Sequence, residues 1–233
     1  MEMNLQFFGG RGSGGESLGG SGGGESVKVE DQIDVWSYRH NKNNEPFVNS
    51  INSAASTVQK DFPELMESGT IYSIDAGKYG GIDNTNTLGY YSPDGELSIN
   101  RNYTNINKMN RVYDRAVEEG YHPSRGNKDG VQAVTYHELG HAATQQLVKQ
   151  GWGKDLDDAA KYVVDNAYKN AKGRGGTKKW AGKISGYAQK NNAECIAEAV
   201  ADFYCNGSKA RKESKAIMSE LKRLAKVEPI PFS

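Results

Sequence analysis

The stretch that decides the fold reads Thr135-Tyr136-His137-Glu138-Leu139-Gly140-His141, inside a longer helical pattern from Val131 to Gln150. Four residues of an α-helix turn the chain by about 400°, so His137 and His141 lie one turn apart on the same face. Glu138 is rotated from His137 by about 100° and lies beside that face. The stretch therefore predicts a helix that directs two imidazoles at one point, with a carboxylate next to them.

This arrangement has the ligand types and the spacing of a zinc site. Two imidazoles one turn apart can share one tetrahedral Zn²⁺, and the neighbouring carboxylate can take a proton from water at the metal. Gly140 adds support, because a glycine inside a helix costs about 1 kcal/mol relative to alanine and predicts close approach of another backbone. The alternative is a chance motif on an ordinary amphipathic helix, although two of the four histidines of the chain fall here. We expect His137 and His141 to bind zinc and Glu138 to act as general base.

A catalytic zinc needs a third protein ligand and an open position for water. A helix predicted from Asn191-Asn192 to about Tyr204 carries an acidic stripe, made of Glu194, Glu198 and Asp202 at intervals of four residues. Like charges at this spacing destabilise a helix, whereas a cation facing them reverses the effect. The alternative is that Glu194 closes a capping box with Asn191 and the other carboxylates face solvent. Ligation by Glu194 is favoured because the histidine pair otherwise lacks a partner.

The two motifs together resemble a known family. His137-Glu-Leu-Gly-His141, followed by Tyr187-Ala-Gln-Lys-Asn-Asn-Ala-Glu194-Cys-Ile-Ala-Glu198-Ala, is similar to the zincin peptidases that include the catalytic domain of anthrax toxin lethal factor and related phage and polymorphic-toxin domains. The resemblance covers roughly residues 96–205. It implies a gluzincin-type fold with Glu194 as third zinc ligand and Glu198 orienting a ligand histidine. It also implies that Tyr187 lies near the zinc and stabilises an oxyanion, the alternative being a buried packing tyrosine.

The remaining pattern indicates the α+β class, with a small hairpin before the active-site helix and more helices after it. The last predicted strand, Glu96–Asn100, is a candidate sheet edge to which an extended peptide would add, although an ordinary hairpin also fits the sequence. His40 and His122 lack ligand spacing to any neighbour, and we expect both to be surface or loop residues. The other predicted elements are helices at Pro46–Met66, Asn105–Glu119, Asp155–Lys172 and Ser208–Lys226, and strands at Thr70–Ile74 and Thr87–Tyr91 joined to Glu96–Asn100 by the turn Ser92-Pro93-Asp94-Gly95.

The composition, 36% hydrophobic and 25% charged, is that of a globular domain with one sizeable core. Residues 9–24 consist mostly of glycine and serine and predict a flexible linker. We therefore divide the chain into a disordered leader, residues 1–26, and a zincin-like domain, residues 27–233. The leader segment Met1–Phe8 resembles the start of phage head and portal-associated proteins, and a plain disordered tail is the alternative.

The charge and hydropathy of the chain limit which kinds of partner and which cellular location can be expected. The net charge of zero gives no reason to expect a nucleic-acid partner, and no apolar run is long enough to span a membrane. The cluster Leu5–Phe8 is too short for a secretory signal. Cys195 and Cys205 would lie about 15 Å apart on one helix, beyond disulfide reach, so free thiols are predicted. These features favour a cytoplasmic or virion-associated protein, or one delivered into a target cell.

The sequence thus predicts a Zn²⁺-dependent endopeptidase that hydrolyses an extended polypeptide, either as a toxin-like effector or as a processing protease. A phage head-associated component that kept the fold with little or no turnover is the main alternative, in which case its partners would be phage virion proteins. A zinc-stabilised binding module without an open metal position is a third.

Overall fold

A computed structural model of the chain describes residues 25–29, 33–37, 45–63, 71–74, 87–91 and 97–227. His40, the leader before residue 25 and the turn predicted at residues 92–95 lie outside these described residues. The strands are β1 (Glu25–Val29), β2 (Ile33–Ser37), β3 (Ile71–Ile74), β4 (Gly89–Tyr91) and β5 (Leu97–Asn100). The helices are α1 (Glu45–Gln59), η2 (Arg101–Tyr103), α2 (Ile106–Glu118), α3 (Gly130–Lys149), α4 (Leu156–Asn170), α5 (Thr177–Ala181), η3 (Tyr187–Gln189), α6 (Asn192–Asn206), η4 (Gly207–Lys209) and α7 (Lys212–Leu224).

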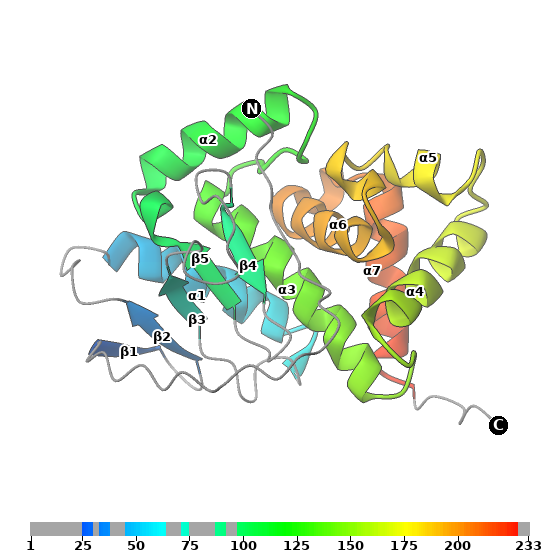
Figure 1. Ribbon diagram of the computed structural model, residues 1–233, viewed down its shortest axis with the longest axis horizontal. Coiled ribbons are helices and arrows are strands. Elements are labelled where there is room, and N and C mark those ends of the chain that lie inside the picture. The colour runs from blue at the N-terminus through cyan, green and yellow to red at the C-terminus, as the bar shows by residue number, and fades with distance from the viewer. Residues whose placement is uncertain are drawn as a thin grey trace, which may run out of the picture.

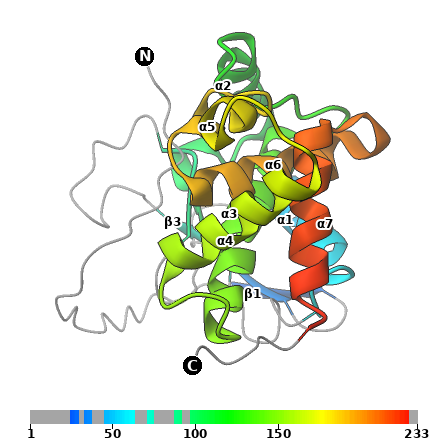
Figure 2. The ribbon, with the colours of Figure 1, turned by 90° about the vertical axis from the view of Figure 1, so that its right-hand side faces the viewer.

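Helix α3 lies at the centre of the molecule. The sheet, α1 and α2 lie on one side of it, and α4 to α7 lie on the other (Figure 1). The sheet side includes contacts of α3 with α1, α2, β4 and β5, and the other side includes contacts with α4 and α6. The view from the α4 and α7 side shows these two helices next to each other in the foreground, with α1 and the sheet farther from the viewer (Figure 2). Mostly helical with one sheet, the structure belongs to the predicted α+β class.

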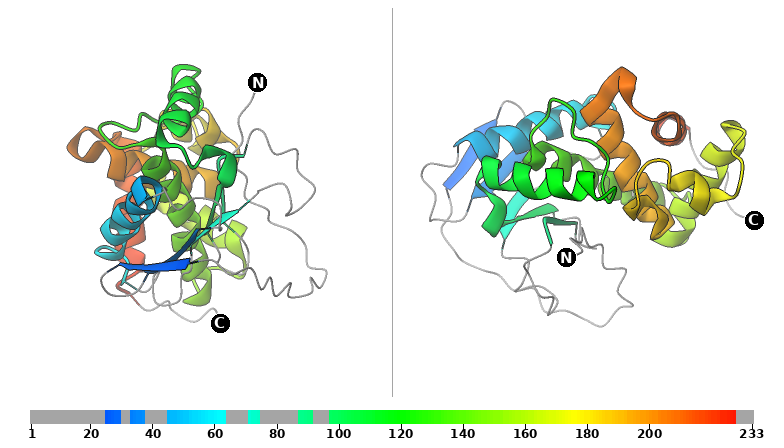
Figure 3. Two further views of the ribbon diagram at one scale, coloured as in Figure 1. Left: turned by 90° about the vertical axis from the view of Figure 1, so that its left-hand side faces the viewer. Right: turned by 90° about the horizontal axis from the view of Figure 1, so that it is seen from above.

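Within the part of the chain that the structure describes, the sheet has five strands in the order β1-β2-β3-β5-β4. β1 and β2 are antiparallel, β2 pairs parallel with β3, β3 pairs parallel with β5, and β5 pairs antiparallel with β4. The two strands of the predicted hairpin, β4 and β5, do pair. The prediction that Glu96–Asn100, which corresponds to β5, forms the edge of the sheet is wrong. β5 lies inside the sheet because β3 pairs with its other side, and β4 is the terminal strand among the described residues. Figure 3 shows the sheet from two further directions.

Several helices begin at the polar residues that the sequence suggests. The side chains of Asn105, Asp155 and Asn191 accept backbone N–H groups at the starts of α2, α4 and α6, which satisfies donors that lack intrahelical partners. The first predicted helix, Pro46–Met66, is too long, because α1 ends at Gln59 and Pro63 disfavours helical backbone at the residue before it. The last helix, α7, starts four residues later than predicted.

The contact between α3 and α6 forms the centre of the core. The predicted close backbone approach at Gly140 is present, because a Cβ placed there would lie 2.7 Å from Ala197 Cα. The two cysteines, Cys195 and Cys205, are both buried on α6 and both free, as predicted. Among the described residues, no helix combines the length and the apolar character that crossing a bilayer requires.

Candidate metal centre

Helix α3 carries the motif into the interior. Its N-terminus is closed by a capping box, in which Asp129 accepts the Gln132 backbone N–H and the Gln132 side chain accepts the Asp129 backbone N–H. The side chains of His137, Glu138 and His141 lie on the following turns and are each about 1% exposed. Burying two imidazoles and a carboxylate is costly unless they are paired or bind a cation.

The third group comes from α6. Asn191 caps this helix by accepting the Glu194 backbone N–H at 2.8 Å, while the Glu194 carboxylate faces the two histidines. Glu194 therefore does not serve as the reciprocal cap that the alternative interpretation required. Burial opposes ionisation of Glu194, but the neighbouring imidazoles of His137 and His141 hold its pKa well below the usual range.

Three ligand atoms form a nearly equilateral triangle. His137 Nε2 lies 3.2 Å from His141 Nε2 and 3.2 Å from Glu194 Oε2, and His141 Nε2 lies 3.4 Å from Glu194 Oε2. Ligands bound at 2.0–2.1 Å in a tetrahedron are separated by about 3.3 Å, so one Zn²⁺ fits above this triangle with a fourth position left for water. These residues are also the one group of three metal-binding side chains in the described part of the chain.

The electrostatic potential at the site is negative and therefore favours a bound cation. Burial lowers the pKa of His137, but the carboxylates of Glu194 and Glu198 outweigh burial and raise it to about 10. The negative potential that holds a proton on this imidazole equally attracts a divalent metal ion, since both are positive charges at the same place.

Glu138 is the least satisfied group of the site. Neither of its carboxylate oxygens has a hydrogen-bond partner among the described residues. Burial raises its pKa to about 8, with His137 opposing the rise and Glu194 adding to it. A Cβ added at Gly89 would lie 2.7 Å from Glu138 Oε1, so this carboxylate lies against the backbone of the edge strand β4.

Glu198 lies behind His137. One of its oxygens, Oε1, accepts a hydrogen bond from His137 Nδ1 at 2.8 Å, and the other, Oε2, accepts one from Ser185 Oγ at 2.7 Å. A carboxylate bonded to Nδ1 leaves Nε2 of the same ring available for a metal. This is the position that the family resemblance implies for Glu198.

His122 was predicted to be an isolated surface or loop histidine, and that prediction is wrong about its exposure. It follows α2 in a loop, but its side chain is wholly buried and its Nδ1 lies 3.0 Å from Glu198 Oε1. No local spacing signals this contact, because the two residues are separated by 76 positions in the sequence.

Tyr187 is the first residue of η3, which places its side chain next to the two histidines and Glu194. Its hydroxyl donates to Glu194 Oε1 at 3.0 Å and accepts a hydrogen bond from Lys190 Nζ at 2.9 Å. Its ring is stacked near His137, with centroids 6.1 Å apart. Burial, followed by the charge of Glu194, raises its pKa well above the ordinary tyrosine value, so the hydroxyl remains a hydrogen-bond donor.

Asp202, the third member of the acidic stripe, is not part of the site. Its carboxylate accepts hydrogen bonds from the Arg211 backbone N–H and Ser214 Oγ at the start of α7, and from the Asn206 side chain. The expectation that all three carboxylates face one cation is therefore wrong: Glu194 faces the histidine Nε2 atoms, Glu198 lies behind His137, and Asp202 lies away from both.

In comparisons with known proteins, no family model matches the chain and no curated protein matches it in sequence.

Proposed function

We propose that this protein is a zinc-dependent endopeptidase of the zincin type. The observation that carries the proposal is the buried triangle of His137, His141 and Glu194, with edges of 3.2–3.4 Å, next to a buried carboxylate that lacks a partner among the described residues. A structural zinc site does not require an additional unpaired carboxylate, whereas hydrolysis requires a carboxylate that can act as general base.

The chain's own groups have separate parts in the reaction. Zn²⁺, when bound, would lower the pKa of a water molecule toward about 7 and polarise the scissile carbonyl. Glu138 accepts the proton of the attacking water on an oxygen that makes no other hydrogen bond, and later delivers it to the leaving amine. Glu198 keeps the proton of His137 on Nδ1, so that Nε2 faces the metal.

Tyr187 is proposed as the donor to the developing oxyanion. Its hydroxyl hydrogen-bonds Glu194 Oε1, so it lies within one carboxylate group of the ligand triangle. Its raised pKa keeps the proton on the hydroxyl, which would turn from Glu194 to the carbonyl oxygen as negative charge develops there and so stabilise the transition state more than the substrate.

The proposed substrate is a polypeptide in extended form, and β4 is where it would add. A terminal strand offers backbone groups to a further strand. Because Gly89 of β4 lies against Glu138, a peptide paired with β4 would bring its carbonyls past the base. The location in cytoplasm, virion or target cell is a proposal from the sequence, and any link to phage virion proteins is a proposal that rests on the leader segment.

The test is zinc content and peptide cleavage of the purified protein, measured for the wild type and for Glu138→Gln on a pool of denatured proteins. We expect about one zinc per chain in both and cleavage by the wild type only. The matched control is Glu118→Gln, the same chemical change at an exposed position of α2. Absence of zinc from the wild type contradicts the site, and zinc without cleavage supports a binding module or a virion component.

A further inference from the structure

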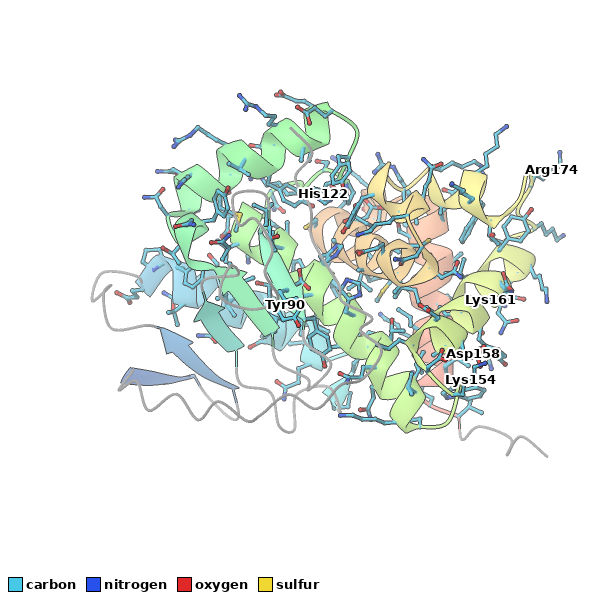
Figure 4. All side chains as sticks on the ribbon, in the orientation of Figure 1. Tyr90, His122, Lys154, Asp158, Lys161 and Arg174 are labelled. Atoms are coloured by element: carbon cyan, nitrogen blue, oxygen red, sulfur yellow. The ribbon has the colours of Figure 1, made fainter. Side chains whose placement is uncertain are left out.

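His122 is enclosed by the metal centre although it supplies no atom of the ligand triangle. Its ring stacks on Tyr113 with centroids 5.3 Å apart, and it meets Tyr121, His137 and Tyr187 edge-on with centroids 5.0–6.4 Å apart. An imidazole held on all these sides is fixed in its rotamer by packing. Figure 4 shows where His122 lies, after the end of α2 and beside the helices that carry the site.

The loop that carries His122 is tied to η3 through the backbone. Gly186 N–H donates to Gly120 O at 2.8 Å, and Tyr187 N–H donates to Tyr121 O at 3.1 Å. These two hydrogen bonds join the loop before α3 to the segment before α6. His122 directly follows Tyr121, the second of the bonded loop residues. Its position is thus set by the same contacts that set the position of Tyr187.

His122 and His137 both contact the same oxygen of Glu198. Oε1 of Glu198 accepts from His137 Nδ1 at 2.8 Å and from His122 Nδ1 at 3.0 Å, while Oε2 accepts from Ser185 Oγ at 2.7 Å. Ser185 Oγ in turn accepts the Ala188 backbone N–H at 3.0 Å, so this side is also fixed to η3. The carboxylate is therefore held from both ends and cannot rotate without losing a charge-assisted hydrogen bond.

The other nitrogen of His122, Nε2, is buried and has no hydrogen-bond partner among the described residues. A buried N–H without a partner is costly, whereas an unprotonated nitrogen in the same place costs less. The proton of the ring is therefore best placed on Nδ1, where it is donated to Glu198.

From this geometry we infer that His122 is a positioning residue for zinc: by fixing Glu198, it holds the His137 ring in the orientation that directs Nε2 at the metal. The inference rests on the proposed zinc site. It assigns no proton transfer to His122, whose action passes through Glu198. Removing a group that orients a ligand histidine typically changes metal affinity about 10- to 100-fold, and that range sets the expected effect.

The experiment measures the zinc dissociation constant of the full chain by competition with a chromophoric chelator. The variants are His122→Leu, which removes the donor, and His122→Asn, whose amide nitrogen reaches roughly the place of Nδ1. We expect the constant to rise about 10- to 100-fold in His122→Leu and to stay within about threefold of wild type in His122→Asn. A wild-type affinity in His122→Leu, or an equal loss in both variants, overturns the inference.

Two controls separate positioning from packing. Tyr113→Leu removes the ring stacked on His122 but none of the hydrogen bonds to Glu198, and we expect it to leave zinc affinity within about threefold of wild type; an equal loss there would mean that packing alone matters. In a Glu198→Gln background, His122→Leu should add little further loss, because the residue through which it acts is already altered. A full additive loss in the double variant contradicts the inference.

A measurement on the wild type covers the case in which His122→Leu does not fold. In ¹⁵N-labelled protein loaded with zinc, imidazole spectra assign the proton of each histidine to Nδ1 or Nε2. We expect His122 and His137 both to carry it on Nδ1, and a His122 protonated on Nε2 alone would overturn the inference. Wild-type protein that binds no zinc removes the proposed function and this inference together, whereas zinc binding that is insensitive to His122 removes only the inference.

Discussion

Replacing Gly140 by alanine tests the packing of α3 against α6, on which the metal site depends. The added Cβ would lie 2.7 Å from Ala197 Cα and 3.3 Å from Val200 Cβ. Non-bonded carbon atoms pack at about 3.5–4.0 Å, so the two helices must separate locally by about 0.8 Å. The contact is with backbone on the α6 side, and no rotamer change can relieve it.

The free energy of unfolding and the zinc affinity should respond differently. Overpacking costs about 1–3 kcal/mol, and the higher helix propensity of alanine returns about 1 kcal/mol, so the net destabilisation is about 0–2 kcal/mol. Zinc–ligand distances, however, tolerate shifts of only about 0.2 Å. Glu194 moves with α6 while His137 and His141 stay on α3, and we therefore expect zinc affinity to fall about tenfold or more.

The assay combines chelator competition with thermal unfolding of the zinc-free protein. The control is Ala142→Gly, which lowers the helix propensity of α3 by about 1 kcal/mol and introduces no clash with α6. It should destabilise the protein and leave zinc affinity close to wild type. Unchanged zinc affinity in Gly140→Ala would refute the reasoning, as would an equal loss of affinity in the control.

Three further predictions concern the same region. Gly89→Val should abolish cleavage and retain zinc, because a Cβ at this position lies 2.7 Å from Glu138 Oε1; cleavage and zinc content of one preparation check this, and wild-type activity would contradict it. Asp202→Ala should lower the free energy of unfolding by about 1–3 kcal/mol, since it leaves donors at the start of α7 without their acceptor. Its zinc affinity should stay at the wild-type level, and a parallel loss would mean that Asp202 belongs to the site after all. Removing zinc with a chelator should lower the midpoint of thermal unfolding, because free zinc at 1,000 times its dissociation constant stabilises the fold by about 4 kcal/mol; a midpoint that does not change with zinc concentration would contradict the site.

Local patterns were enough to predict the helical part of the site. The relation of His137, Glu138 and His141 depends only on the helical repeat, and the N-cap Asn191 acts on its own backbone neighbours. The structure places these residues as the periodicity requires, because no distant part of the chain decides them.

Contacts between distant segments were not predictable in the same way. β5 was expected at the edge because the sequence reveals its hairpin partner β4, whereas its parallel pairing with β3 crosses a long connection. His122 was assigned to the surface for the same reason, since its partner Glu198 lies on a helix that reaches it only after α3 and α4 have packed. In both cases the missing information is a tertiary contact and not a local propensity.

The acidic stripe of α6 shows how a single crossing point resolves such an ambiguity. Glu194, Glu198 and Asp202 look equivalent in sequence, but a helix rises about 1.5 Å per residue, so Asp202 lies about 12 Å along the axis from Glu194. The site itself spans only the single turn between His137 and His141. Gly140 meets Ala197, which lies between Glu194 and Glu198, and this contact fixes where α6 crosses α3. The two carboxylates that flank the crossing reach the histidines, and Asp202, beyond it, is left to cap α7. A glycine on one helix and an alanine flanked by acidic residues on the other are thus the sequence features from which the crossing, and with it the choice of ligand, follows.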